Sequence, residues 1–313
     1  MLNRRHIRIK VMQTIYAMQQ NQSDLMDSSE KFLTYSLESI RDLYLLMLSS
    51  LIEVQKVENE FLELSAQKHL ATPEERNPNR KFVNNRLLQV LVTSESLNNN
   101  IDESGINDFK VNDQYIKILL TEIKSSDLYK EYMQKSSTTF EEDRDFVVAL
   151  FTDIIAPNEK IYEYLEDNKL TWVDDIPLVN TAIQKQLKQL KSDVDYFRIP
   201  RVFKDEDDKE YAKLLFRKTM LNGRELSDEF SDKTPNWDVE RIAELDIIIL
   251  KMAICELQKF PSIPVKVTIN EYLEIAKEYS TPKSSIFING ILDALVKEYQ
   301  KEGKFAKAGR GLM

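Results

Sequence analysis

The sequence has 313 residues, of which 42% are hydrophobic and 30% charged, the composition of a globular protein with one large domain or two modest ones. Its formal net charge of −9 argues against a general nucleic-acid coat, although screening over about 10 Å leaves room for a local basic patch. Only 6 glycines and 9 prolines are present, too few for the turns of a β-rich fold, so the sequence predicts an all-α protein with long helices.

Targeting and catalytic signals are missing from the sequence. The apolar run at 43–52 is far too short to span a bilayer, and no continuous apolar stretch follows the basic N-terminus, so we expect a cytoplasmic protein. The two histidines and Cys255 are far apart in the chain and offer no catalytic triad or zinc set, and no glycine-rich nucleotide loop occurs. We therefore predict that the protein is not an enzyme and holds no cofactor or metal.

The first predicted helix, within residues 1–22, has a basic N-terminal end. It contains no acidic residue, and Arg4, Arg5 and Arg8 fall within an arc of about 100° on its surface. Apolar residues behind this start recur at helical spacing and predict a stripe that faces a core: Ile7, Val11, Ile15 and Met18. We expect the first turns to project past the core and to leave the three arginines exposed.

Residues 30–67 are predicted to form one long helix. Apolar residues alternate four and three apart along it, as in the seam of a helix that packs lengthwise on its neighbours. The polar stretch 71–80, which contains prolines, predicts a loop. Helical patterns return at about 82–98 and 111–134.

An internal echo relates residues 141–175 to residues 206–240 at an offset of 65 positions. It includes the pair Trp172 and Trp237, and a decayed duplication and the chance recurrence of an acidic helix start explain it equally well. Thr139 and Glu142 fit a capping box at the start of the first stretch. The acidic run 205–208 is better explained as a helix N-terminus than as a divalent-cation site, because no further ligands follow at a defined spacing.

The last third of the chain predicts three consecutive helices of a bundle. The first, from about Trp237, is apolar nearly all round, which is typical of a central helix, and it stops near Pro261 and Pro264. A second helix follows from Val265, and a third begins near Ser284 after several candidate capping residues. The short links between the three helices predict antiparallel packing.

Motifs at both ends of the chain occur in a defined order and spacing. The C-terminal ones are IPVKVTINEYLEIAKEYS at 263–280, SSIFINGILD at 284–293 and a D-x-x-I-L-x-x-A-x-x-E-L pattern at 246–257. The N-terminal one is RRHIRIKVMQTIY at 4–16. In these segments the chain resembles the NusB family of transcription antitermination factors, whereas residues 25–200 far exceed the usual connection of that family.

The resemblance implies a domain organisation and a function. The fold would be a NusB-like helical bundle of residues 1–24 and 201–300, enlarged by a helical insertion at 25–200 and followed by a flexible basic tail at 301–313. The protein would bind the boxA element of ribosomal RNA leader transcripts together with the ribosomal protein NusE. The complex would act on RNA polymerase during ribosomal RNA transcription.

The resemblance also assigns residues to two surfaces. Single-stranded RNA needs cations for its phosphates and flat groups for its bases, and the predicted RNA-binding residues are Arg4, Arg5, His6, Arg8, Lys10, Lys283, Ser284 and Phe287. Glu256 is expected on a surface that faces NusE, where Cys255 replaces a usual aromatic residue. The alternative is a helical protein–protein scaffold of the same fold without RNA binding, which the acidic composition and the large insertion favour.

Overall fold

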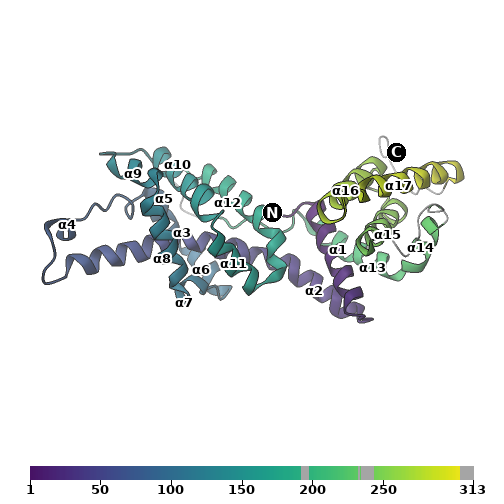
Figure 1. Cartoon of the computed structure of the whole chain (residues 1–313), viewed down its shortest axis with the longest axis horizontal. Helices are drawn as coiled ribbons and strands as arrows, with labels where there is room; N and C mark the ends of the chain where they lie inside the picture. The colour runs from purple at the N-terminus through teal and green to yellow at the C-terminus, as the bar shows by residue number, and fades with distance from the viewer. Residues whose placement is uncertain (192–196, 232, 234–242, 304–313) are drawn as a thin grey trace. The chain divides into compact units, whose positions relative to one another are not determined.

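The structure is a computed structural model that describes residues 1–191, 197–231, 233 and 243–303. All regular elements within these ranges are helices, so the predicted all-α fold is confirmed. Among these helices, none combines the length and the apolarity needed to cross a membrane. The chain forms two compact units (Figure 1): the terminal unit, Leu2–Leu37 with Phe203–Met313, and the middle unit, Glu38–Val202.

Helix α15 (Glu244–Lys259) is the centre of the terminal unit. Apart from Lys251, every residue from Ile248 to Leu257 is buried, because the helix is surrounded by five others and needs no polar face. The predicted central position of this helix is therefore confirmed. The five surrounding helices are α1 (Arg4–Gln20), α13 (Glu206–Leu221), α14 (Gly223–Ser231), α16 (Val265–Tyr279) and α17 (Ser284–Glu302).

The predicted ends of the C-terminal helices agree with the structure. α15 ends at Lys259, α16 begins directly after Pro264, and α17 begins at Ser284. The hydroxyls of Ser280 and Ser284 both donate to the buried carboxylate of Asp246, at 2.6 and 2.7 Å, and so join the α16–α17 link to α15. Trp237 lies outside the described residues, as do residues 304–313 of the predicted tail, while residues 301–303 complete the end of α17.

The middle unit is built around α3 (Ile40–Ala66). This helix packs against α4 (Pro73–Arg76), α5 (Arg86–Thr93), α6 (Glu95–Glu103), α7 (Asp108–Val111), α8 (Asp113–Ser125) and α12 (Ile176–Gln189). The other helices of the unit are α9 (Asp127–Gln134), α10 (Phe140–Leu150) with a π-helical extension at Phe151–Ile155, and α11 (Glu159–Asn168) with a 3-10 turn at Leu170–Asp175. The helical patterns predicted at 82–98 and 111–134 therefore correspond to several short helices.

The prediction of one helix over residues 30–67 is wrong. The segment forms α2 (Met26–Glu38) and α3, which are separated at Ser39. The backbone of Ser39 turns to a ψ of −11°, and its carbonyl oxygen accepts a hydrogen bond from the indole Nε1 of Trp172 at 3.1 Å. The break between α2 and α3 thus coincides with a hydrogen bond from Trp172, which is 133 residues away in the chain. The local apolar pattern does not reveal this break.

Both acidic runs singled out in the sequence open helices. The predicted capping box is present at α10, where the Thr139 hydroxyl accepts from the backbone of Glu142 and the Glu142 carboxylate accepts from the backbone of Thr139. The side chain of Asp205 caps α13 by accepting from the backbone of Asp208. Among the described residues, no group of three or more His, Cys, Asp or Glu side chains is arranged to hold a metal ion.

Candidate nucleic-acid interface

The N-terminal turn of α1 presents two arginines that are partly exposed. Asn3 caps the helix by accepting from the backbone of His6. Arg4 donates from Nε to Asp208 on α13 at 2.8 Å, and Arg5 forms two hydrogen bonds of 2.9 Å with Glu271 on α16. Each of the two arginine side chains is 39% exposed. Their guanidinium groups are thus oriented by carboxylates while remaining open to solvent.

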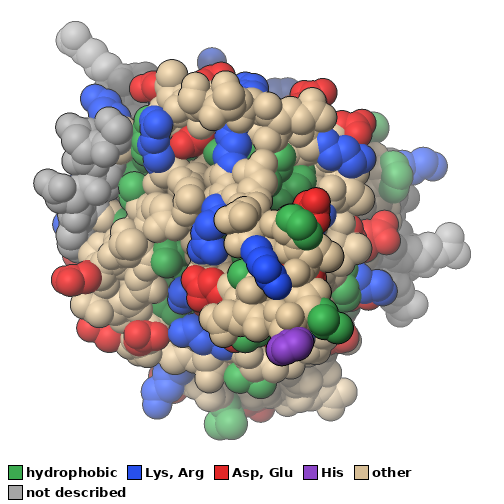
Figure 2. All heavy atoms as spheres, turned by 90° about the vertical axis from the view of Figure 1, so that its left-hand side faces the viewer, with side chains coloured by type: hydrophobic (Ala, Val, Ile, Leu, Met, Phe, Trp, Pro, Cys, Tyr) green, Lys and Arg blue, Asp and Glu red, His purple; other side chains and the backbone are tan. Residues whose placement is uncertain are grey.

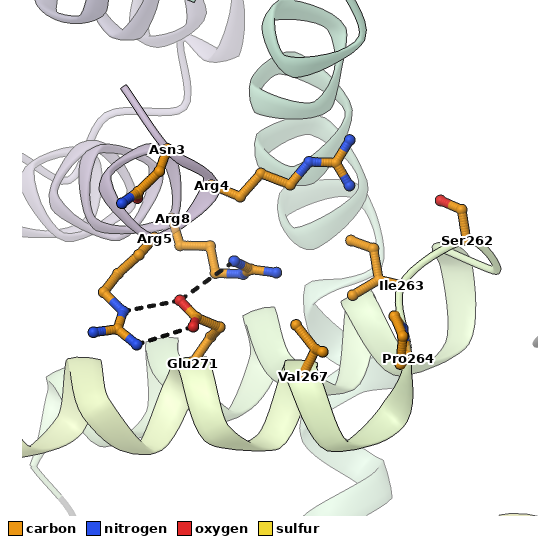
Figure 3. A pocket seen from close by; sticks show the side chains of 9 residues that line it. All are labelled: Asn3, Arg4, Arg5, Arg8, Ser262, Ile263, Pro264, Val267 and Glu271. Atoms are coloured by element: carbon orange, nitrogen blue, oxygen red, sulfur yellow. Dashed lines mark hydrogen bonds and ion pairs between the residues drawn. The ribbon is translucent and has the colours of Figure 1, made fainter. Parts of the chain in front are cut away.

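A groove of about 520 Å³ lies beside these arginines. One wall is the first turns of α1, and the other is the α15–α16 loop with the start of α16 (Figure 3). In Figure 3, Arg5 and Arg8 both point toward Glu271, whereas Ile263, Pro264 and Val267 form the apolar part of the lining. Cationic donors, a carboxylate and an apolar wall meet here, a combination suited to the phosphates and bases of single-stranded RNA.

Arg8 does not match the prediction that all three arginines are exposed. Its residue exposure is 1%, and it forms two hydrogen bonds of 2.8 and 2.7 Å with the fully buried carboxylate of Glu256 on α15. The same carboxylate also accepts from three hydroxyls: Tyr211, Thr268 and Tyr272. The prediction failed because α13, α15 and α16 close around the second turn of α1 and not only around its apolar stripe.

The Arg8–Glu256 pair is electrostatically matched. Burial by itself would raise the pKa of Glu256, but the hydrogen bonds and positive charge of Arg8 outweigh that effect and hold the pKa below the usual glutamate value. Burial raises the pKa values of Tyr211 and Tyr272 well above that of a free tyrosine, and the negative charge of Glu256 raises them further. The tyrosines are therefore neutral hydrogen-bond donors, and the pair is a structural anchor between α1 and α15.

The other predicted cations of α1 are not fully exposed. Lys10, which was predicted to assist RNA binding, is buried, with 3% of its surface accessible. His6 is half-buried, and its pKa is lowered first by burial and then by the positive charges of Arg5 and Lys10. The imidazole is therefore a neutral group at physiological pH, and neither residue lines the groove.

The predicted RNA-binding residues at the start of α17 are separate from the groove. Lys283 is exposed and Phe287 is half-buried. Ser284 is 2% exposed and donates its hydroxyl hydrogen to Asp246, so this serine stabilises the helix start and is not open to a ligand. None of the three residues belongs to the groove lining, and the structure does not bring them together with Arg4 and Arg5.

The two predicted partner-binding residues lie in the interior. Glu256 and Cys255 both have 0% exposure, so the expectation that they form a surface is wrong. Glu256 is buried because it forms an ion pair with Arg8 in the interior. Cys255 is buried because it lies on α15, which is apolar nearly all round. Burial raises the pKa of the Cys255 thiol to about 11, which keeps it protonated and unreactive.

Sequence reasoning missed the carboxylates that orient the arginines. In the sequence, Asp208 belongs to an acidic helix start and Glu271 to a motif on α16, and neither position indicates an arginine partner. The sequence nevertheless indicates that such carboxylates are needed. The first helix carries three arginines and no acidic residue, so the segments that pack against it must supply the negative charges. The apolar groove residues Ile263, Pro264 and Val267 carried no such signal.

Comparisons with known proteins point to one family. The family model described as "NusB family" matches residues 179–297. The transcription antitermination protein NusB of Salinibacter ruber is 42% identical over 115 residues, which cover 36% of this chain and 72% of that protein. The NusB protein of Chloroherpeton thalassium is 38% identical over 105 residues, which cover 34% of this chain and 50% of that protein. A solved structure of T. maritima NusB aligns at 26% identity over 54% of this chain and 98% of that chain, with a TM-score of 0.30 that is too low to establish a shared arrangement.

Proposed function

Because this chain belongs to the NusB family, we propose that it is a transcription antitermination factor that binds RNA. In this proposal it acts in the cytoplasm and binds boxA-type single-stranded RNA together with the ribosomal protein NusE. The complex then acts on RNA polymerase during ribosomal RNA transcription. The proposal contains no catalytic step.

The groove beside Arg4 and Arg5 is the observation that carries the RNA-binding part of the proposal. Within the described residues, the two Nη groups of Arg4 and the Nη1 group of Arg5 make no hydrogen bond, so these donors are open to a ligand. The amide groups at the N-terminus of α1 add positive potential on the same side. A phosphate fits the donors, and an unstacked base fits against Val267, which is 43% exposed.

The carboxylate partners of the arginines support recognition of RNA in a defined geometry. Glu271 holds the guanidinium plane of Arg5 through two parallel hydrogen bonds. An arginine oriented in this way loses less side-chain freedom when it binds a phosphate or stacks on a base. The cost is that each carboxylate weakens the net positive potential, so we expect moderate affinity in the absence of NusE.

The test is a titration of fluorescently labelled boxA-type RNA with the protein, with and without NusE, over a range of salt concentrations. The variant Arg4→Gln/Arg5→Gln is compared with Lys117→Gln/Lys160→Gln, which removes the same charge from two exposed lysines paired with carboxylates in the middle unit. Loss of two phosphate contacts is expected to reduce the slope of log K against log salt by about 1.4. Equal affinity of the two variants would rule out the groove as the RNA site.

The scaffold alternative has one observation in its favour, since all three arginines of α1 are paired with carboxylates. A protein of that kind would bind neither boxA-type RNA nor a scrambled RNA at any salt concentration, whether or not NusE is present. Binding of boxA-type RNA that NusE strengthens, and that a scrambled RNA lacks, would exclude it.

A further inference from the structure

Five exposed cations of the middle unit lie at the C-terminal end of α12 and on the segment that follows it. They are Lys185, Lys188, Lys191, Arg198 and Arg201. Within residues 1–191, 197–231, 233 and 243–303, no ion pair is formed by any of these five side chains. They differ in this respect from most other cations of the same unit, which have a carboxylate within 4 Å.

Hydrogen bonds hold Phe197 and Arg198 against α6 and α12. The side chain of Gln186 donates from Nε2 to the carbonyl of Arg198 at 2.8 Å and accepts from the hydroxyl of Tyr44 at 2.5 Å. Phe197 is buried, and both its backbone N–H and its carbonyl bond to the hydroxyl of Ser96, at 3.2 and 3.0 Å. The backbone of Arg198 therefore lies beside the turn of α12 that carries Lys185 and Lys188. These three cations, with Lys191 and Arg201 next to them in the chain, are named here the α12 basic surface.

The α12 basic surface stands out against an acidic unit. Residues 38–175 contain 27 acidic and 15 basic residues, a balance of −12, whereas residues 176–202 contain 5 basic and 2 acidic residues, a balance of +3. The two acids, Asp193 and Asp195, lie outside the described residues. Figure 2 shows acidic and basic side chains interspersed over the end of the middle unit that it displays. The charged residues of 176–202 that the structure describes are, by contrast, all basic.

We propose that the α12 basic surface is a second RNA-binding surface that contacts the phosphate backbone. The proposal rests on the function proposed above and deepens it. An acidic unit repels RNA over most of its surface, so a polyanion can approach closely only where positive charge is not compensated. Among the described residues of 176–202 the surface presents cations and no exposed aromatic side chain, which fits contact with phosphates and not recognition of bases.

Helix stabilisation alone does not account for these cations. Lys188 is in the last turn of α12, where a positive charge complements the helix dipole. Arg198 and Arg201 are outside the helix, and Lys185 is a full turn before its end, so the dipole has little effect on them. The buried face of α12, which carries Val179, Ile183 and Leu187, points away from Lys185, and substitution of the lysines leaves that face intact.

The test compares two variants of the full chain that carry the same change of charge. Lys185→Gln/Lys188→Gln/Lys191→Gln removes three cations of the α12 basic surface. Lys117→Gln/Lys130→Gln/Lys160→Gln removes three exposed lysines of the same unit that are paired with neighbouring carboxylates on their own helices. The probe is a fluorescent boxA-type RNA extended to roughly 30 nucleotides, long enough for more than one contact region.

We expect the first variant to bind about 100-fold more weakly than wild type at 0.1 M salt, with a slope of log K against log salt that is shallower by about 2, because three single-strand phosphate contacts are lost. The control variant is expected to bind like wild type. Equal binding of the two variants overturns the second surface while leaving the groove unaffected. Absence of binding by the wild-type protein is the distinct outcome in which the proposed function itself fails, and the second surface with it.

Discussion

Replacement of Arg8 by methionine is expected to destabilise the terminal unit strongly. The substitution keeps an aliphatic side chain but removes the cation from Glu256, whose carboxylate has no exposed surface. Removal of one partner of a buried ion pair typically costs about 3–5 kcal/mol, because an uncompensated charge is left behind. Three hydroxyl donors still solvate the carboxylate, so we expect a loss near the lower end of that range, about 3 kcal/mol.

Urea denaturation followed by far-UV circular dichroism measures this loss. Because the chain has two compact units, the data are fitted with two transitions. Arg5→Met is a matched control on the same helix, because the hydrogen bonds of Arg5 to Glu271 have distances similar to those of Arg8 to Glu256. The Arg5 side chain is 39% exposed, and an exposed ion pair contributes about 0–1 kcal/mol to stability. In the double variant Arg8→Met/Glu256→Gln an amide oxygen still accepts from the hydroxyls, and we expect more than half of the lost stability to return.

A loss for Arg8→Met no greater than that for Arg5→Met would refute this reasoning. The buried pair would then contribute no more than a surface pair, and α1 would be held by its apolar contacts alone. A double variant less stable than Arg8→Met would refute the second step, because it would show that the remaining negative charge on Glu256 is not the source of the loss.

Three further predictions concern Glu256 itself and two other buried groups. The pKa of Glu256 is lower in the folded protein than the value of about 4.3 in the unfolded chain. The ionised carboxylate therefore contributes stability that is fully present above the unfolded pKa and is lost as pH falls through the folded pKa. Urea midpoints measured between pH 7 and pH 3 should accordingly fall at the acidic end. With its pKa raised to about 11, Cys255 should not react with a thiol reagent at pH 8 until the protein is unfolded; fast reaction of the native protein would contradict its burial. Tyr132→Phe removes the hydroxyl that donates to buried Asp143 at 2.7 Å and should destabilise the middle unit by about 1–3 kcal/mol in the same urea experiment, whereas an unchanged midpoint would show that this hydrogen bond is not needed.

Local sequence patterns determined the first helix, the three C-terminal helices and several helix ends. The Thr139–Glu142 capping box was predicted from two residues three positions apart, and the end of α15 from Pro261 and Pro264. These features depend on neighbours within one helical turn, and such interactions can be derived from the sequence itself. The all-round apolar character of α15 likewise predicted its central place.

Only the tertiary structure decided which arginines of α1 are exposed and which one is buried. Periodicity placed Arg4, Arg5 and Arg8 on one side of a helix, but it could not show that Glu256, 248 positions away, would take Arg8 into the interior. The interruption at Ser39 likewise coincides with a hydrogen bond from Trp172, 133 positions away. The helical pattern of a sequence predicts on which face of the helix a side chain lies. Its burial and ion pairing depend on the other segments that the fold packs against that face.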